Sequence, residues 1–139
     1  MSELVVDASV VVKWYIPEQH HEQARGLRDA YLNGTFDLFA PALMPFEAVN
    51  ALKYSGHYEG ERLEEASKSL PEYGIDLVPF NKTGPVAEIA TNLGITVYDA
   101  AYIALARKLS TKAYTADGNL LDSLEGEYSM LAEHIRTYS

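Results

Sequence analysis

Residues 4–14 read LVVDASVVVKW, and this stretch decides the fold class. Its first three residues are a short apolar run of the kind that forms a strand, and Asp7 ends the run. Residues 10–16 are then expected to form a first helix, with Ser9 placed to cap its N-terminus. A short strand that passes directly into a helix is typical of α/β proteins.

The same alternation of apolar runs and helical patterns continues to the end of the chain. We expect further strands at 37–40, 75–80 with an interruption at Pro79, 112–115 and 129–135. We expect further helices at 20–31, at 46–54 after Pro45, at 61–70 before Pro71, at 86–93, from Asp99 onward and at 119–124. No repeat or linker divides the 139 residues. The sequence therefore predicts one α/β layered domain with a mostly parallel sheet.

Composition and charge limit the possible functions. The chain has no cysteine, which excludes a disulfide framework and a thiolate metal site. It starts without the features of a signal peptide and has no apolar stretch long enough to span a bilayer, so we expect a soluble, cytoplasmic protein without a membrane partner. The net charge is −9, from 20 acidic and 11 basic residues, which argues against binding nucleic acid through a broad basic surface.

Four acidic residues are predicted to meet at one edge of the sheet. Asp7 ends the first strand, Asp117 follows the strand at 112–115, and Glu47 and Asp99 fall in the first turns of helices. In an open α/β sheet, ligands bind beyond the carboxyl ends of the strands, where such helices begin. Clustered carboxylates repel one another unless protonated or bridged by cations, and hard oxygen ligands suit Mg²⁺ or Mn²⁺.

Each of these acids also has a simpler interpretation. Asp99 could cap its helix, and Glu47 could be a favourable charge beside a helix N-terminus. Asp117 precedes Gly118, and Asp-Gly is an ordinary turn. Asp7 is harder to explain in this way, because a buried carboxylate at a strand end needs a partner. Geometry alone makes a metal site plausible and leaves these alternatives open.

Four motifs, in order and at the right spacing, resemble those of PIN-domain ribonucleases of the VapC toxin type. They are residues 4–14, residues 40–52 (APALMPFEAVNAL), residues 96–106 (TVYDAAYIALA) and residues 114–120 (YTADGNL). The resemblance covers nearly the whole chain. It implies a single PIN domain over 1–139, with a three-layer α/β/α sandwich.

The resemblance also implies roles for individual residues. Asp7 and Asp99 would bind the metal most directly, and Glu47 and Asp117 would complete the catalytic acidic site. The supporting positions implied are Ser9, Thr115 and Asn50, the last one helical turn beyond Glu47. The role of Asp122, a further acid after the fourth motif, stays open.

The resemblance further implies an activity and partners. Family members of this type cleave RNA with Mg²⁺ or Mn²⁺, are silenced by a cognate antitoxin protein and are usually homodimers. Lys13 could contact an RNA phosphate, although a solvated lysine on the first helix is the alternative. Trp14 is expected in the core or a dimer contact. The adjacent pair His20 and His21 is expected at a solvated helix start rather than at a metal, because neighbouring helical residues point apart.

Two other functions compete with this interpretation. An aspartate-based phosphatase would place a second acid two positions after the first, where this chain has Ser9, and a receiver domain would need paired acids and a late lysine. A catalytically inert PIN-like module that binds RNA or protein would be favoured by loss of one of the four acids, and none is lost.

Overall fold

The computed structural model describes residues 2–139 and contains a five-stranded parallel sheet. The strand order is β3-β2-β1-β4-β5, so the first strand is central. The strands are β1 (Ser2–Val6), β2 (Phe36–Pro41), β3 (Asp76–Val78), β4 (Ala113–Thr115) and β5 (Ala132–His134). All neighbouring strands pair in parallel, which confirms the predicted sheet.

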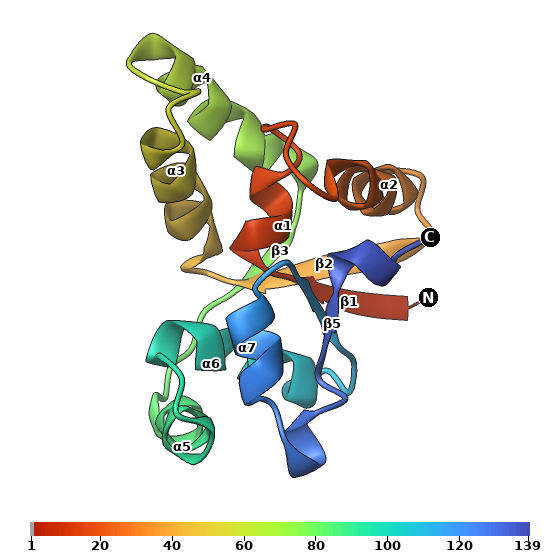
Figure 1. Cartoon of the computed structure of the whole chain (residues 1–139), viewed down its shortest axis with the longest axis vertical. Coiled ribbons are helices and arrows are strands. Elements are labelled where there is room, and N and C mark those ends of the chain that lie inside the picture. The colour runs from red at the N-terminus through yellow and green to blue at the C-terminus, as the bar shows by residue number, and fades with distance from the viewer. Residues whose placement is uncertain (1) are drawn as a thin grey trace.

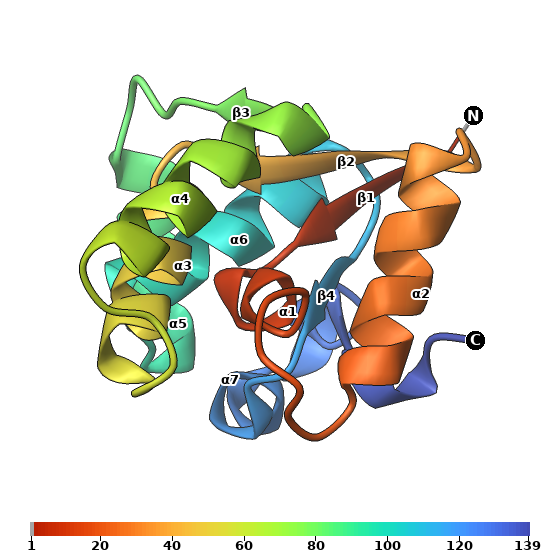
Figure 2. The same ribbon diagram turned by 90° about the horizontal axis from the view of Figure 1, so that it is seen from above.

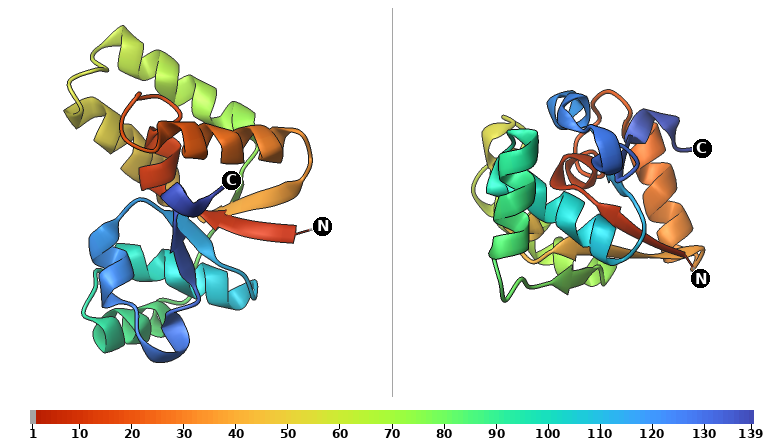
Figure 3. Two further views of the ribbon diagram at one scale, coloured as in Figure 1. Left: turned by 45° about the vertical axis from the view of Figure 1, so that its right-hand side comes forward. Right: turned by 90° about the horizontal axis from the view of Figure 1, so that it is seen from below.

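Helices cover both faces of this sheet and make three layers (Figure 1). The layer drawn above the sheet holds α1 (Ala8–Val12), α2 (His21–Leu32), α3 (Met44–Tyr54) and α4 (Glu61–Ser69). The layer below it holds α5 (Gly84–Leu93), α6 (Val97–Lys108) and α7 (Gly118–Ser123). Figure 2 and the right panel of Figure 3 show the two layers from above and from below. The predicted three-layer α/β/α sandwich is therefore confirmed.

The core explains why the central elements form where they do. Val5 and Val6 of β1 are fully buried, and α6 buries every residue from Ala100 to Ala106. A strand that is apolar on both faces is typical of a parallel sheet between two helical layers. Both chain ends lie on the side of the molecule where β1 begins (Figures 1 and 3). Asp7 follows the last residue of β1, at the opposite end of that strand from the N-terminus.

Several predicted boundaries were wrong, for local reasons. The first helix spans Ala8–Val12 rather than 10–16, because Asp7, not Ser9, is its N-cap. The strands expected at 75–80 and 129–135 are only three residues long each. Pro71 lies inside a 3-10 turn, η1 (Leu70–Tyr73), which follows α4 directly. The sixth helix begins at Val97, with Thr96 as its N-cap.

In residues 2–139, no single helix is both long and apolar enough to cross a membrane. Helices α5 and α6 reach the required length and composition only as a pair, and they are bent by 110° relative to each other.

Candidate active site

Asp7 stands at the junction of β1 and α1 and is 7% exposed. Its Oδ2 accepts hydrogen bonds from the Ser9 backbone N–H at 3.2 Å, from the Thr115 hydroxyl at 3.1 Å and from the Ser9 hydroxyl. All three bonds go to one oxygen. The carboxylate is thereby fixed in place, and Oδ1 remains available for another ligand.

The hydroxyls of Ser9 and Thr115 link Asp7 to the turn that carries Asp117. Ser9 Oγ accepts from the Ala116 N–H at 2.9 Å, and Thr115 Oγ1 accepts from the Asp117 N–H at 3.0 Å. The two hydroxyl oxygens are 3.3 Å apart. The neighbouring positions of β1 and β4 in the sheet bring these residues together.

Asp117 is the N-cap of α7, which begins at Gly118, so the Asp-Gly pair starts a helix rather than forming an ordinary turn. Its Oδ1 accepts from the backbone N–H groups of Asn119 and Leu120, at 3.0 and 3.2 Å. Its second oxygen takes no part in these capping bonds and could serve as a ligand. Asp122 is exposed on α7 and makes none of these contacts.

Asp99 is not the cap of its helix. The N-cap is Thr96, whose hydroxyl oxygen accepts from the Asp99 backbone N–H at 3.0 Å. Asp99 lies in the first turn of α6, and its side chain is partly exposed. The alternative explanation of Asp99 as a helix cap is therefore wrong.

Glu47 lies in the first turn of α3 and is held by Tyr102, a residue that the sequence did not single out. The Tyr102 hydroxyl donates a hydrogen bond of 2.6 Å to Glu47 Oε1. Tyr102 is fully buried on α6. The only available signal was the position of Tyr102 three residues after Asp99, and the partner, 55 residues away, could not be deduced from it.

Mutual repulsion connects the four acids. Burial raises the pKa of Asp7 and the charge of Asp99 adds to the rise, while hydrogen bonds from Ser9 and Thr115 offset part of it. Burial, then the charges of Asp7 and Asp99, raises the pKa of Glu47, against the hydrogen bond from Tyr102. Burial and then the charge of Asp117 raises the pKa of Asp99. Asp7, Glu47 and Asp99 thus lie near enough to other acids of the site for those charges to disfavour their ionisation.

The four side chains are of the type that binds a hard divalent cation, although they are not arranged around a single ion position. None of the three ion pairs found in residues 2–139 involves these four acids, so protein cations do not compensate the cluster. Across the same residues, no three acidic or histidine side chains are already close enough to hold one ion. Side-chain rotation would have to bring carboxylate oxygens together. Oxygen-only donors of this kind suit Mg²⁺ or Mn²⁺.

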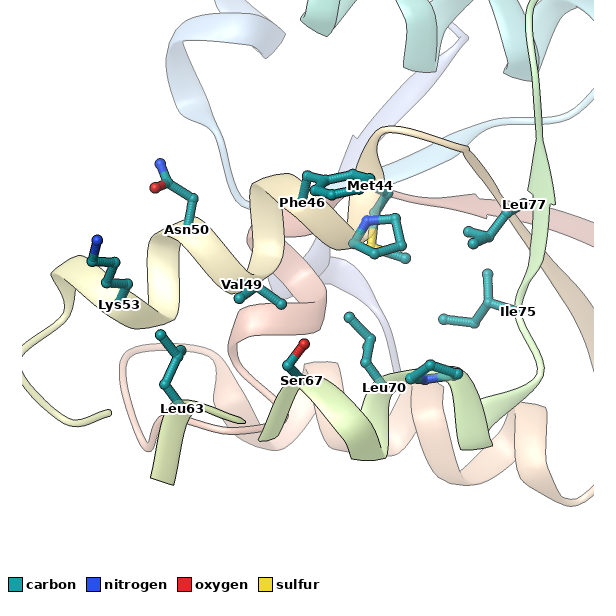
Figure 4. Close-up of a pocket in the computed structure, with 12 residues that line it drawn as sticks. Met44, Phe46, Val49, Asn50, Lys53, Leu63, Ser67, Leu70, Ile75 and Leu77 are labelled. Atoms are coloured by element: carbon teal, nitrogen blue, oxygen red, sulfur yellow. The ribbon is translucent and has the colours of Figure 1, made fainter. Parts of the chain in front are cut away.

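Asn50 lies at the rim of an apolar groove of about 580 Å³ between α3, α4 and β3 (Figure 4). Phe46 and Val49 of α3, together with Leu70 and Leu77, line the groove. Figure 4 shows the Asn50 amide directed away from the apolar side chains. The structure therefore places Asn50 beside this groove, on the same helix as Glu47.

Lys13 is 7% exposed, so its interpretation as a solvated lysine is wrong. Its Nζ donates to the Gln19 carbonyl at 2.6 Å and pairs with Glu18 at 3.2 Å. The ammonium group is therefore bonded to the loop after α1 and not to an acid of the site. Trp14 is buried, as expected, and donates its Nε1–H to the Ala24 carbonyl at 2.9 Å.

Comparison with known proteins agrees with this architecture. The model of a family described as the PIN domain matches residues 4–125. The chain is 37% identical over 128 residues to Ribonuclease VapC3 of Pyrobaculum aerophilum, and the match covers 86% of this chain and 93% of that protein.

Two solved structures share the fold. The crystal structure of PAE2754 from Pyrobaculum aerophilum superposes with a TM-score of 0.69 at 23% identity, over 98% of this chain and 91% of the other. A structure of FitAB bound to an IR36 DNA fragment superposes with a TM-score of 0.68 at 16% identity, over 98% and 97%. At these identities the likeness extends to the fold alone. The family model and the curated relative together show that the chain belongs to the PIN-domain family, among proteins of the VapC type.

Proposed function

We propose that this chain is a metal-dependent endoribonuclease that hydrolyses RNA with Mg²⁺ or Mn²⁺. The observation that carries the proposal is that four carboxylates from separate elements lie near enough for their charges to act on one another, and that burial and these charges raise the pKa values of Asp7, Glu47 and Asp99. A divalent cation would relieve this repulsion. The name of its relative, Ribonuclease VapC3, supports RNA as the substrate.

In this mechanism, Asp7 and Asp99 would hold the cation most directly, and Glu47 and Asp117 would complete the site. When bound, the cation supplies a water of lowered pKa and a clamp for the phosphodiester. Ser9 and Thr115 hold the Asp7 carboxylate in one orientation through their hydroxyls. The Asp117 cap fixes one of its oxygens and leaves the other as a ligand.

The chain would act as the toxin of a toxin–antitoxin pair in the cytoplasm. Its similarity to a VapC protein supports a cognate antitoxin as partner, and the family match over residues 4–125 supports one PIN domain over 1–139. We propose a homodimer as the working form. The net charge of −9 means that RNA affinity would depend on the bound cation and on local basic side chains.

A cleavage assay on single-stranded RNA tests the proposal and separates the enzyme from an inert binding module. We expect cleavage only with Mg²⁺ or Mn²⁺, and products with a 5′-phosphate and a 3′-hydroxyl. The proposed site consists of carboxylates and includes no histidine or lysine that could promote cleavage without a metal. The ion must therefore supply the activated water. Cleavage that continues undiminished in excess chelator would contradict this function.

A further inference from the structure

The Tyr102 hydroxyl of α6 holds one acid of the site, Glu47 of α3. Tyr102 belongs to α6, which covers one face of the sheet, and Glu47 belongs to α3 on the other face (Figure 1). Their hydrogen bond of 2.6 Å therefore links the two helical layers at the acidic site. Tyr102 is 0% exposed, so the surrounding core holds its ring in place.

The position of Tyr102 also connects Glu47 with Asp99. Residues three apart on a helix are neighbours on its surface, so α6 presents Asp99 and Tyr102 side by side. One helix thus supplies both an acid of the site and the group that holds a second acid. The bond uses only Oε1 of Glu47 and leaves Oε2 as a possible ligand.

Glu47 needs such an anchor. It is half-buried at the start of α3 and carries several rotatable bonds, and the charges of Asp7 and Asp99 repel it. A carboxylate that is repelled and free to rotate would turn toward solvent. A hydrogen bond from an immobile phenol opposes that rotation.

We propose that Tyr102 is a positioning residue whose hydroxyl orients the Glu47 carboxylate for divalent-cation binding. This inference rests on the proposed metal-dependent function and adds a residue to its site. Tyr102 acts through Glu47 and contacts neither substrate nor cation. Outer partners that orient ligands typically contribute about 10–100-fold to metal affinity.

Tyr102→Phe tests this role, because it removes the hydroxyl and keeps the buried ring. Tyr128→Phe is the matched control: Tyr128 is also buried, and its hydroxyl accepts a bond from Asn92 at 3.2 Å, without contact to the four acids. In calorimetric titrations with Mn²⁺, we expect the Kd of Tyr102→Phe to rise roughly 10–100-fold. We expect Tyr128→Phe to keep the parent's Kd.

A second variant shows whether the effect passes through Glu47. Glu47→Asp keeps the charge but shortens the side chain by one methylene, so the carboxylate no longer reaches Tyr102. We expect Glu47→Asp to weaken Mn²⁺ binding, and we expect Tyr102→Phe to add little when combined with it, because contacting residues are not additive. Fully additive losses would contradict positioning through Glu47.

The outcomes distinguish this inference from the proposed function. If the parent binds Mn²⁺ and cuts RNA, but Tyr102→Phe binds Mn²⁺ with the parent's Kd, the role of Tyr102 is wrong and the function stands. If the parent neither binds Mn²⁺ nor cuts RNA, both fail. Melting in chelator checks the fold of each variant. Should Tyr102→Phe not fold, Glu47→Asp decides alone, and parental Mn²⁺ affinity in that variant overturns the proposal.

Discussion

Asp7 ends a buried strand, whereas Asp99 stands in the partly exposed first turn of a helix. One oxygen of Asp7 accepts three hydrogen bonds, two of them from hydroxyls that are themselves bonded to the backbone around β4. At Asp99, the Thr96 hydroxyl accepts a hydrogen bond from the backbone N–H and caps the helix. The Asp7 carboxylate is therefore on the rigid side of the site, at β1 and β4, and the partly exposed Asp99 carboxylate at the start of α6 is on the side with more freedom to adjust.

This difference indicates how the acids would come to share an ion. The rigid carboxylate of Asp7 provides a fixed reference point. Asp99 would complete the cation's coordination by a small rotation, while Tyr102, on the same helix as Asp99, holds the Glu47 carboxylate of α3 in place. The following predictions test this contrast between a rigid and an adjustable side, from the largest expected effect to the smallest.

The largest effect is expected for Asp99→Asn. The neutral amide removes a charge that the cation needs, so RNA cleavage should fall by more than the roughly 10–100-fold typical of an outer partner. The fold should survive, because Thr96, rather than Asp99, caps α6. Single-turnover cleavage with Mn²⁺ measures this effect, and a mutant that cuts RNA at the parent's rate would remove Asp99 from the site.

Divalent cations should stabilise the folded protein. The acids are gathered only in the native state, so the cation binds that state preferentially. At a hundredfold excess over its dissociation constant, one ion adds about 2.7 kcal/mol to the free energy of unfolding. Thermal melting in millimolar Mn²⁺ and in chelator measures the shift, with Na⁺ as the control for ionic strength. An unchanged melting temperature would count against cation binding.

The rigid side should be the more sensitive to loss of a hydroxyl. Thr115→Val removes a fully buried donor to Asp7 and the acceptor for the Asp117 N–H, at a cost of about 1–3 kcal/mol. Thr96→Ala removes a surface helix cap and should cost about 1 kcal/mol. Denaturant unfolding in chelator compares the two variants. A larger loss for Thr96→Ala would reverse the assignment of rigid and adjustable sides.

Much of this architecture follows from local sequence. The run of apolar residues before Asp7 predicts the first strand, and the alternation of strands and helices predicts the mostly parallel sheet; the central place of that strand is known only from the structure. The start of the first helix was misplaced because Asp7 and Ser9 both carry oxygens able to cap it. Only the contact with β4 shows that the Ser9 hydroxyl serves Asp7 and Ala116 instead.

The features of the site that could not be predicted from the sequence depend on long-range contacts. The partner of Tyr102 lies on another helix, so an aromatic residue on an apolar face gave no sign of a polar role. The burial of Lys13 depends on the path of the following loop, which brings the Gln19 carbonyl to its ammonium group. Neither contact leaves a periodic pattern in the sequence.

A smaller effect on the stability of the folded protein is expected from a change of pH in the absence of metal. The raised pKa values of Asp7, Glu47 and Asp99 mean that the folded protein holds protons more tightly than the unfolded chain. Their contribution to stability is therefore fully present below the unfolded pKa of about 4, and is lost as pH rises through the raised values. Asp99→Asn removes one of these groups and relieves the others.

Melting curves in chelator, recorded between pH 4 and pH 7, test this sign. The parent should lose stability relative to Asp99→Asn as pH rises, because the mutant has one charge fewer in the cluster. Taking the difference between the two proteins cancels the titration of groups outside the site. A difference that stays constant with pH would show that the acids do not repel one another as described.

The central claim is that the four acids together form one cation-binding site. Calorimetric Mn²⁺ titration of the parent and of Asp7→Asn, Glu47→Gln, Asp99→Asn and Asp117→Asn tests it most directly. We predict that the parent binds Mn²⁺ and that each substitution weakens binding, with Asp7→Asn and Asp99→Asn weakening it most. Binding at the parent's affinity in all four variants, or no binding by the parent, would contradict the account.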